Sequence, residues 1–200
     1  MKQSPKLPAQ IRRAQLIDAA IEVFNRKGFT GATTEDIARK AGVTKGALYF
    51  HFKNKEDIFL AVVKETAGRH IEQILEYLKT QPPINRFIKV VVHDYMGILK
   101  EEKQLTIELW EQAHKIRRVR DYMANVHGKM VNNIARYIKK NSSLSTNKSK
   151  SLIWIMHAIF DGMLVQKLCY EGAINYKIMA DQIISMHQLY LKKHKATDKI

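Results

Sequence analysis

The stretch TTEDIARKAGVTKGALYFHFKNKEDIF, residues 33–59, decides the fold class of this 200-residue chain. Thr33 is followed three residues later by Asp36, the spacing at which a threonine caps a helix and an acidic side chain bonds back to the cap. Gly42 then permits a sharp turn, and Thr44 can cap a second short helix. Two short helices joined by a glycine-containing turn form a helix-turn-helix, a motif whose second helix enters the major groove of DNA.

Helical periodicity continues on both sides of this stretch. Apolar residues spaced three and four apart predict a helix that ends at Gly28 and a long helix that runs from Asn54 to the Pro82-Pro83 break. The same spacing predicts further helices over about 87–99, 105–110, 119–138, 149–171 and 176–193. No segment between residues 10 and 80 has the alternation of a strand. We therefore expect an all-α protein of about nine helices.

The length of the chain suits a small domain joined to a larger one. Residues 1–9 lack periodicity and are expected to form a flexible arm. Residues 10–60 are expected to form a three-helix, helix-turn-helix DNA-binding domain, and residues 61–195 a helical domain for effector binding and dimerisation.

The composition limits the possible classes of function. The formal net charge of +15 favours a polyanionic partner, but the basic residues are spread along the chain, so the argument for DNA binding depends on the motif. The single cysteine, the absence of a secretion signal and the absence of a run of about 18 apolar residues predict a cytoplasmic protein without a membrane partner. We find no catalytic constellation, cofactor motif or metal-ligand spacing, so the sequence predicts no enzyme, cofactor or metal site.

Residues 33–59 closely resemble the signature of the TetR family of bacterial repressors. The recognition helix of that family commonly has a small hydroxyl residue, a variable residue, glycine, a small residue, leucine, tyrosine and two aromatics, and TKGALYFH matches all but the last position, where His51 stands. The resemblance covers about residues 10–60, and the rest of the chain only in architecture. It implies a homodimeric transcriptional repressor that a small-molecule effector releases from a palindromic, double-stranded DNA operator.

The resemblance also implies that Thr44 through Tyr49 lie in the major groove and that His51 and Lys55 face phosphates. Gly46 and Ala47 are small enough for close approach to base edges, and hydroxyl, imidazole and ammonium groups are the donors that phosphates accept. The predicted DNA-binding residues are Thr33, Thr34, Thr44, Lys45, Gly46, Ala47, Tyr49, His51 and Lys55.

Not every residue of this stretch is expected to face DNA. Leu48, Phe50 and Phe52 are expected in the core, because a recognition helix needs an apolar face against its neighbours. The sequence leaves open whether Lys45 is merely solvated and whether Tyr49 only packs. The basic run at residues 115–120 is expected to be a solvated helix start rather than a second nucleic-acid site.

The last two predicted helices carry more apolar surface than one subunit core needs, which predicts an isologous four-helix dimer interface. Its expected members are Leu152, Ile155, Met156, Ile159, Met163, Met179, Ile183, Met186 and Tyr190. Large side chains with some polar groups also predict a cavity for an apolar or aromatic effector, although core packing accounts for them almost as well. The candidate effector residues are Phe87, Tyr95, Trp110, His114, Tyr122, Trp154, His157 and Phe160.

An effector-independent architectural or cell-division factor of the same fold is the alternative function. One palindromic operator would favour the repressor, whereas many dispersed sites would favour the architectural protein.

Overall fold

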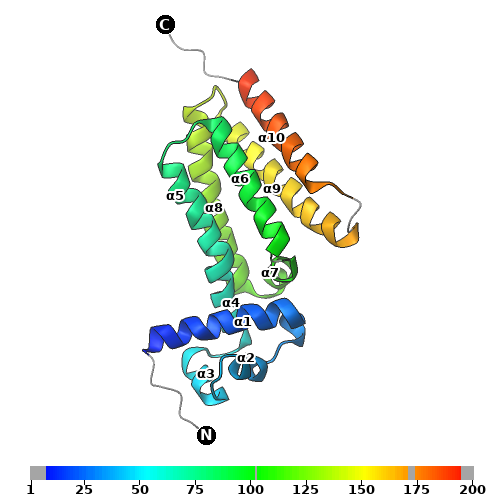
Figure 1. Ribbon diagram of the computed structural model, residues 1–200. Coiled ribbons are helices and arrows are strands. Elements are labelled where there is room, and N and C mark those ends of the chain that lie inside the picture. The colour runs from blue at the N-terminus through cyan, green and yellow to red at the C-terminus, as the bar shows by residue number, and fades with distance from the viewer. Residues whose placement is uncertain (1–7, 102, 171–173, 195–200) are drawn as a thin grey trace. The chain divides into compact units, whose positions relative to one another are not determined.

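The computed structural model describes residues 8–101, 103–170 and 174–194, and these residues form helices without any strand (Figure 1). The elements are α1 (Ala9–Gly31), α2 (Thr34–Lys40), α3 (Lys45–His51), α4 (Lys55–Val63), the π-helical segment η1 (Lys64–Gly68), α5 (Arg69–Lys79), α6 (Ile84–Glu101), α7 (Lys103–Lys115), α8 (Arg117–Lys140), α9 (Thr146–Cys169) and α10 (Tyr176–Lys193). If α4, η1 and α5 are taken as one continuous helix, the described residues form nine helices, in agreement with the sequence.

These helices form two compact units. Among the described residues, the first unit takes 8–70 and 103–124, and the second takes 71–101, 125–170 and 174–194. The sequence predicted one boundary near residue 60, whereas the structure groups α7 and the start of α8 with the helix-turn-helix. Most of the predicted N-terminal arm lies outside the described residues.

The core of the first unit is built on α1, which contacts α2, α4 and α7. Phe24, Phe29 and Phe59 form a cluster of three rings, with centroids 4.9 to 5.8 Å apart. Asn25 on α1 accepts a hydrogen bond of 3.2 Å through its side-chain oxygen from the backbone N–H of Leu105. Large aromatic rings supply much of the apolar area that a small core buries, so this cluster helps to hold α1 against α4.

The helix boundaries of the DNA-binding region follow the predicted caps. Asp36 N–H donates to Thr33 Oγ1 at 3.1 Å and Thr33 N–H donates to Asp36 Oδ2 at 3.2 Å, which completes a capping box. Thr44 and Asn54 cap α3 and α4 through their side-chain oxygens. Gly28 and Gly42 have φ values of +68° and +67°, a conformation that glycine adopts without steric cost.

In Figure 1, the helices of the second unit run lengthwise as a bundle in which α10 packs on α6. An aromatic cluster joins three of its segments: Phe87 lies 6.2 Å from Tyr77 and 5.2 Å from Tyr137, measured between ring centroids. The Tyr137 hydroxyl donates to the carbonyl of Pro82. Ser145 caps α9, so this helix begins three residues before the predicted start.

The π-helical segment interrupts the predicted long helix. Gly68, the last residue of η1, is buried against the Tyr122 hydroxyl, and a methyl group in place of its hydrogen would overlap that oxygen. Lys64 lies over the Tyr122 ring, with its ammonium nitrogen 5.5 Å from the ring centroid. A π-helical turn inside an α-helix needs a local cause. In η1 we attribute it to the close approach of the Tyr122 hydroxyl to Gly68, which has no side chain.

Candidate DNA interface

The turn between α2 and α3 fixes the mutual position of the two helices. The N–H of Val43 donates to the carbonyl of Ala38 at 2.9 Å, and Gly42 lies between them with positive φ. Leu48 and Phe52, one helical turn apart, are only 0% and 3% exposed. Their burial holds α3 on the rest of the unit and turns its opposite face, with Gly46 and Tyr49, to the surface.

Thr34, a predicted DNA-binding residue, is only 8% exposed, and its hydroxyl joins α2 to the exposed Tyr49 of α3. Their hydroxyl oxygens are 3.2 Å apart, and the Lys45 ammonium lies 5.8 Å from the centroid of the Tyr49 ring. The Tyr49 side chain is therefore both exposed and held in one orientation. The sequence left open whether Tyr49 faces DNA or only packs. In the structure its ring is exposed, while its hydroxyl packs against Thr34.

Lys45 forms an ion pair with Glu35 of α2. The hydrogen bond and charge of Glu35 raise the pKa of the Lys45 ammonium, and Lys45 in turn lowers the pKa of the Glu35 carboxyl. Lys45 is therefore partnered rather than simply solvated. The charge that it offers to a phosphate or a base is partly offset by a carboxylate of the same surface.

Other cations of the first unit are held in the same way. Asp36 accepts from Lys27 at 2.8 Å and from Arg39 at 2.5 Å, while Lys40 pairs with Glu22. The hydrogen bonds from Lys27 and Thr33 lower the pKa of the Asp36 carboxyl to about 2. Among these, the Arg39 side chain is the most exposed, which leaves it accessible to an approaching anion.

The remaining predicted DNA-binding residues divide between caps and surface. The hydroxyls of Thr33 and Thr44 are used as helix caps. Gly46 is exposed, and a Cβ placed on it would meet only the Thr44 hydroxyl oxygen at 3.9 Å, so this part of α3 allows close approach. Ala47 and His51 are half-buried.

Two expectations for this region are corrected. Phe50 is 80% exposed rather than in the core, because Leu48 and Phe52 fill the buried face and Phe50 lies two residues from each, on the other side of the helix. Its ring meets the His51 ring edge-on at a centroid distance of 5.1 Å.

Lys55 points into the protein. Its ammonium donates to the carbonyls of Phe29 at 2.7 Å, Ala32 at 2.9 Å and Thr30 at 3.4 Å, and lies 4.5 Å from the centroid of the Phe29 ring. An ammonium has three donors, so these carbonyls occupy all of them. Instead of the predicted phosphate contact, Lys55 binds the last turn of α1 and Ala32, which follows that helix.

Three side chains of the basic run at residues 115–120 form ion pairs within the first unit. Lys115 pairs with Glu111 at 2.5 Å, Arg117 with Asp121 at 3.5 Å, and Arg118 with Asp57. The Arg118 guanidinium lowers the pKa of the Asp57 carboxyl. The three basic side chains are also 58% to 84% exposed, so this run is a solvated helix start, as expected, whose charges are paired.

The eight predicted effector residues divide between the two compact units. Trp110, His114 and Tyr122 belong to the first unit, whereas the other five belong to the second. Trp110 and His114 are exposed on α7, and Trp154 is half exposed on α9, so these three are corrected to surface positions. Phe87 is buried in the aromatic cluster already described. The apolar periodicity of the sequence could not tell which of these large side chains would be buried and which would be exposed.

Three of the predicted residues lie in a polar part of the second unit. Tyr95 stacks on Phe160 with ring centroids 4.1 Å apart, and its hydroxyl lies 3.5 Å from Asp161 Oδ1. Burial raises the pKa of both Tyr95 and Asp161. His157 lies 5.2 Å from His127 between ring centroids, and burial together with this neighbour lowers the pKa of His157 to about 4. Asp161 and His127 were not predicted, because each is a single polar residue in a helical pattern.

The predicted dimer residues also divide. Met156, Met163 and Ile183 are buried within the subunit, so their assignment to a surface between subunits is corrected. Leu152, Ile159 and Met179 are half-buried, and Ile155, Met186 and Tyr190 are exposed. The exposed apolar residues that the sequence analysis missed on α9 and α10 are Trp154, Val165, Ile178 and Leu189. We call the exposed residues Trp154, Ile155, Val165, Ile178, Met186, Leu189 and Tyr190 the α9–α10 face.

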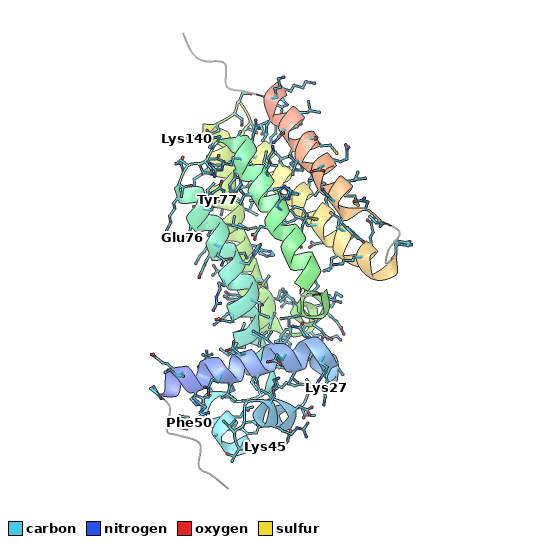
Figure 2. All side chains as sticks on the ribbon, viewed as in Figure 1. Lys27, Lys45, Phe50, Glu76, Tyr77 and Lys140 are labelled. Carbon is cyan, nitrogen blue, oxygen red and sulfur yellow. The ribbon has the colours of Figure 1, made fainter. Side chains whose placement is uncertain are left out.

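Two grooves on the surface of the second unit are formed wholly by its own helices and loops. One, of about 540 Å³, lies between α5 and α8 and includes Glu76 and Lys140, which Figure 2 labels. The other, of about 590 Å³, lies between the start of α6 and the end of α10. None of the eight predicted effector residues lines either groove. Within the described residues, no group of three or more histidine, cysteine or acidic side chains could hold a metal ion, and no helix is long and apolar enough to cross a membrane.

Comparison with known proteins agrees with this geometry. Residues 16–62 match the model of the tetR family of bacterial regulatory proteins. The fatty acid metabolism regulator protein of Bacillus subtilis (strain 168) is 36% identical over 93 residues, which make up 46% of this chain and 48% of that protein. The chain thus spans about half the length of this curated relative.

Two solved structures share the fold over nearly the whole chain. FadR from Bacillus subtilis in complex with stearoyl-CoA has a TM-score of 0.70 and 21% identity, and covers 86% of this chain and 96% of its own. The fatty acid degradation regulator FadR from Bacillus halodurans has a TM-score of 0.67 and 23% identity, and covers 96% of this chain and 97% of its own. The match over residues 16–62 thus shows that the α1–α4 region resembles bacterial regulatory proteins of the tetR family, and the two solved structures show that nearly the whole chain shares their fold.

Proposed function

We propose that this protein is a homodimeric transcriptional repressor that binds a palindromic DNA operator and leaves it when a small-molecule effector binds. The observation that carries the proposal is the outer face of α3. Gly46, Tyr49 and Phe50 are exposed there on a helix anchored by Leu48 and Phe52, and a helix so held can insert into the major groove.

Selection of operators from a pool of random duplex DNA tests the DNA-binding part. We expect enrichment of one palindromic sequence, bound with an affinity that falls steeply as salt rises, because phosphate contacts release counterions. Gly46→Glu would place a carboxylate on the outer face of α3 and should weaken operator binding about a hundredfold through repulsion of the phosphates.

Gly97→Glu is the matched control, since Gly97 is also an exposed helical glycine with open space around its Cβ position. Equal binding by both variants, or a wild-type protein that enriches no sequence, would contradict the proposal. Enrichment of many unrelated sites would favour an architectural protein instead.

The homodimer is proposed from the α9–α10 face. Ile155 and Leu189 are 55% and 67% exposed in the single subunit, and two copies of such a face can cover each other about a two-fold axis. Ile155→Glu should yield monomers at micromolar concentration and reduce operator affinity, because the second half-site contact is lost. Val90→Glu, on an exposed apolar residue of α6, is the control. Sedimentation that shows an intact dimer for Ile155→Glu would contradict this interface.

The effector is proposed to bind the second unit and to be apolar or aromatic. A regulator of fatty acid metabolism shares 36% identity with part of this chain, and one structure of the same fold holds stearoyl-CoA, so this acyl-CoA is the first probe to use. The stacked pair Tyr95–Phe160, next to Asp161, offers an apolar wall with polar groups beside it. Both α5 and α8 begin in the first unit and end in the second, so they provide a continuous path for coupling.

Calorimetric titration with stearoyl-CoA tests this part, with and without operator DNA. An effector that releases DNA binds the DNA-free protein more tightly, and each tenfold of release needs about 1.4 kcal/mol of differential affinity. By reciprocity, operator DNA should weaken acyl-CoA binding by the same factor. Equal affinities in both titrations would mean that stearoyl-CoA is not the effector.

A further inference from the structure

Phe50 is the most exposed aromatic ring of the short helix α3, next to the less exposed Tyr49. It is 80% exposed, the highest value for a large apolar side chain among the described residues. Leu48 in α3 and Phe52 directly after the helix are 0% and 3% exposed. Exposure of a whole phenyl ring to water is unfavourable, so a ring held in this position is suited to an apolar partner.

The surroundings of Phe50 favour DNA as that partner. Gly46 lies four residues earlier on the same side of α3 and has no side chain to shield the ring. The edge-on contact with His51 limits the motion of the ring. Lys45 and Lys53 are exposed on either side in sequence, and Figure 2 labels Lys45 and Phe50 on α3. A small apolar surface flanked by cations suits an apolar group in a polyanion better than it suits the broad apolar patch of a protein partner.

Thymine is the base that presents an apolar group in the major groove, its C5-methyl. We propose that Phe50 is a specificity-determining residue that contacts a thymine methyl group in each operator half-site. The inference rests on the proposed function and deepens it, because it names the base that one residue recognises. Phe50 is the exposed side chain of α3 without a polar group, whereas Lys45 ends in an ammonium and Tyr49 in a hydroxyl that contacts Thr34.

Replacement of thymine by uracil removes the methyl group alone, so it tests the contact directly. In the operator selected above, each thymine is replaced in turn by deoxyuridine at both symmetric positions, and affinity is measured for the wild type and for Phe50→Ala. At one position we expect the operator affinity of the wild type to fall about fourfold for each methyl group removed, or about fifteenfold for the symmetric pair. Phe50→Ala should bind duplexes with thymine or uracil at that position with equal affinity. At all other positions, uracil should lower its affinity as much as it lowers that of the wild type.

Val90→Ala is the control, since it shortens an exposed apolar side chain in the second unit. Each uracil substitution should lower its operator affinity as much as that of the wild type. Because Phe50 is exposed, its variant should unfold at the same temperature as the wild type, which circular dichroism can verify.

Several results would overturn the inference. The first is that uracil substitution lowers the operator affinity of Phe50→Ala as much as that of the wild type at every position. The second is that no uracil substitution changes the operator affinity of the wild type. The third is that Phe50→Ala changes the assembly state but not the response to uracil, which would identify a contact with protein. In these cases operator binding by the wild type stands. A wild type that selects no duplex would instead overturn the proposed function, and the inference with it.

Discussion

The ammonium nitrogen of Lys55 lies 2.7 Å from the carbonyl oxygen of Phe29 and 4.5 Å from the centroid of its ring. This contact, with those to Thr30 and Ala32, ties the start of α4 to the segment that leads into α2. We therefore expect Lys55 to support the proposed DNA binding by positioning Thr33 and Thr34 rather than by contact with a phosphate.

Lys55→Met should therefore lower the free energy of unfolding by about 2 kcal/mol, since carbonyls bonded to a charged group lose their partner. Chemical denaturation measures this loss. The slope of log affinity against log salt should stay that of the wild type, and Lys55→Arg should recover part of the stability. A slope smaller by about one would show instead that Lys55 neutralises a phosphate.

Glu35 restrains the charge of Lys45 by its ion pair. Glu35→Gln should free one cation beside the outer face of α3, so affinity for DNA of any sequence should rise about threefold and the salt slope should steepen by about one. Filter binding over a range of salt concentrations measures both. Glu76→Gln, which frees Lys79 from a similarly exposed pair on α5, is the matched control and should leave both values unchanged. A slope equal to that of the wild type would show that Lys45 makes no phosphate contact once it is free.

Asp36 makes the stability of the first unit depend on acid pH. Its folded pKa of about 2 lies below the ordinary value of 3.8, chiefly because of the hydrogen bond from Lys27. A depressed folded pKa stabilises the protein above the unfolded pKa, and this contribution is lost as the pH falls from about 4 towards 2. Thermal unfolding should thus show a large difference between wild type and Asp36→Asn at pH 7 that shrinks across this window. Asp18→Asn, on an exposed side chain of α1, should differ little from wild type at any pH.

Gly68 and Tyr122 should be coupled in stability. Gly68→Ala should destabilise the protein by about 2 kcal/mol, because its methyl group overlaps the Tyr122 hydroxyl. Tyr122→Phe removes that oxygen and leaves the ring carbon Cζ, 3.4 Å away, as the nearest atom, so the double variant should recover most of the loss. A double-mutant cycle by denaturation gives the coupling, and additive losses would mean that the two side chains do not meet.

Local signals in the sequence were sufficient to place the starts of α2, α3 and α4. Thr33, Thr44 and Asn54 each cap a helix as predicted, because a cap depends on residues three positions apart. The start of α9 was placed too late, since Ser145 is one of several polar residues that could have served as its cap.

Signals that depend on tertiary structure were beyond the sequence. The carbonyls that bind Lys55 lie 23 to 26 residues away along the chain, and no periodicity indicates them. An excess of apolar residues on α9 and α10 predicted a surface between subunits, yet it could not show that Met163 turns inward and Ile155 outward. Phe50 is a different case: Leu48 and Phe52 are spaced for one helix face, and this spacing alone excludes Phe50 from it.

The positions of the two tryptophans provide a spectroscopic assay. Trp110 belongs to the first compact unit and Trp154 to the second, and each is about half exposed, at 44% and 50%. Substitution of either one by phenylalanine leaves a single intrinsic fluorophore that reports on one unit without any label. Denaturation curves of the two variants then show whether the units unfold together or one after the other. Quenching by iodide in the presence of DNA or an acyl-CoA shows which of them senses each ligand.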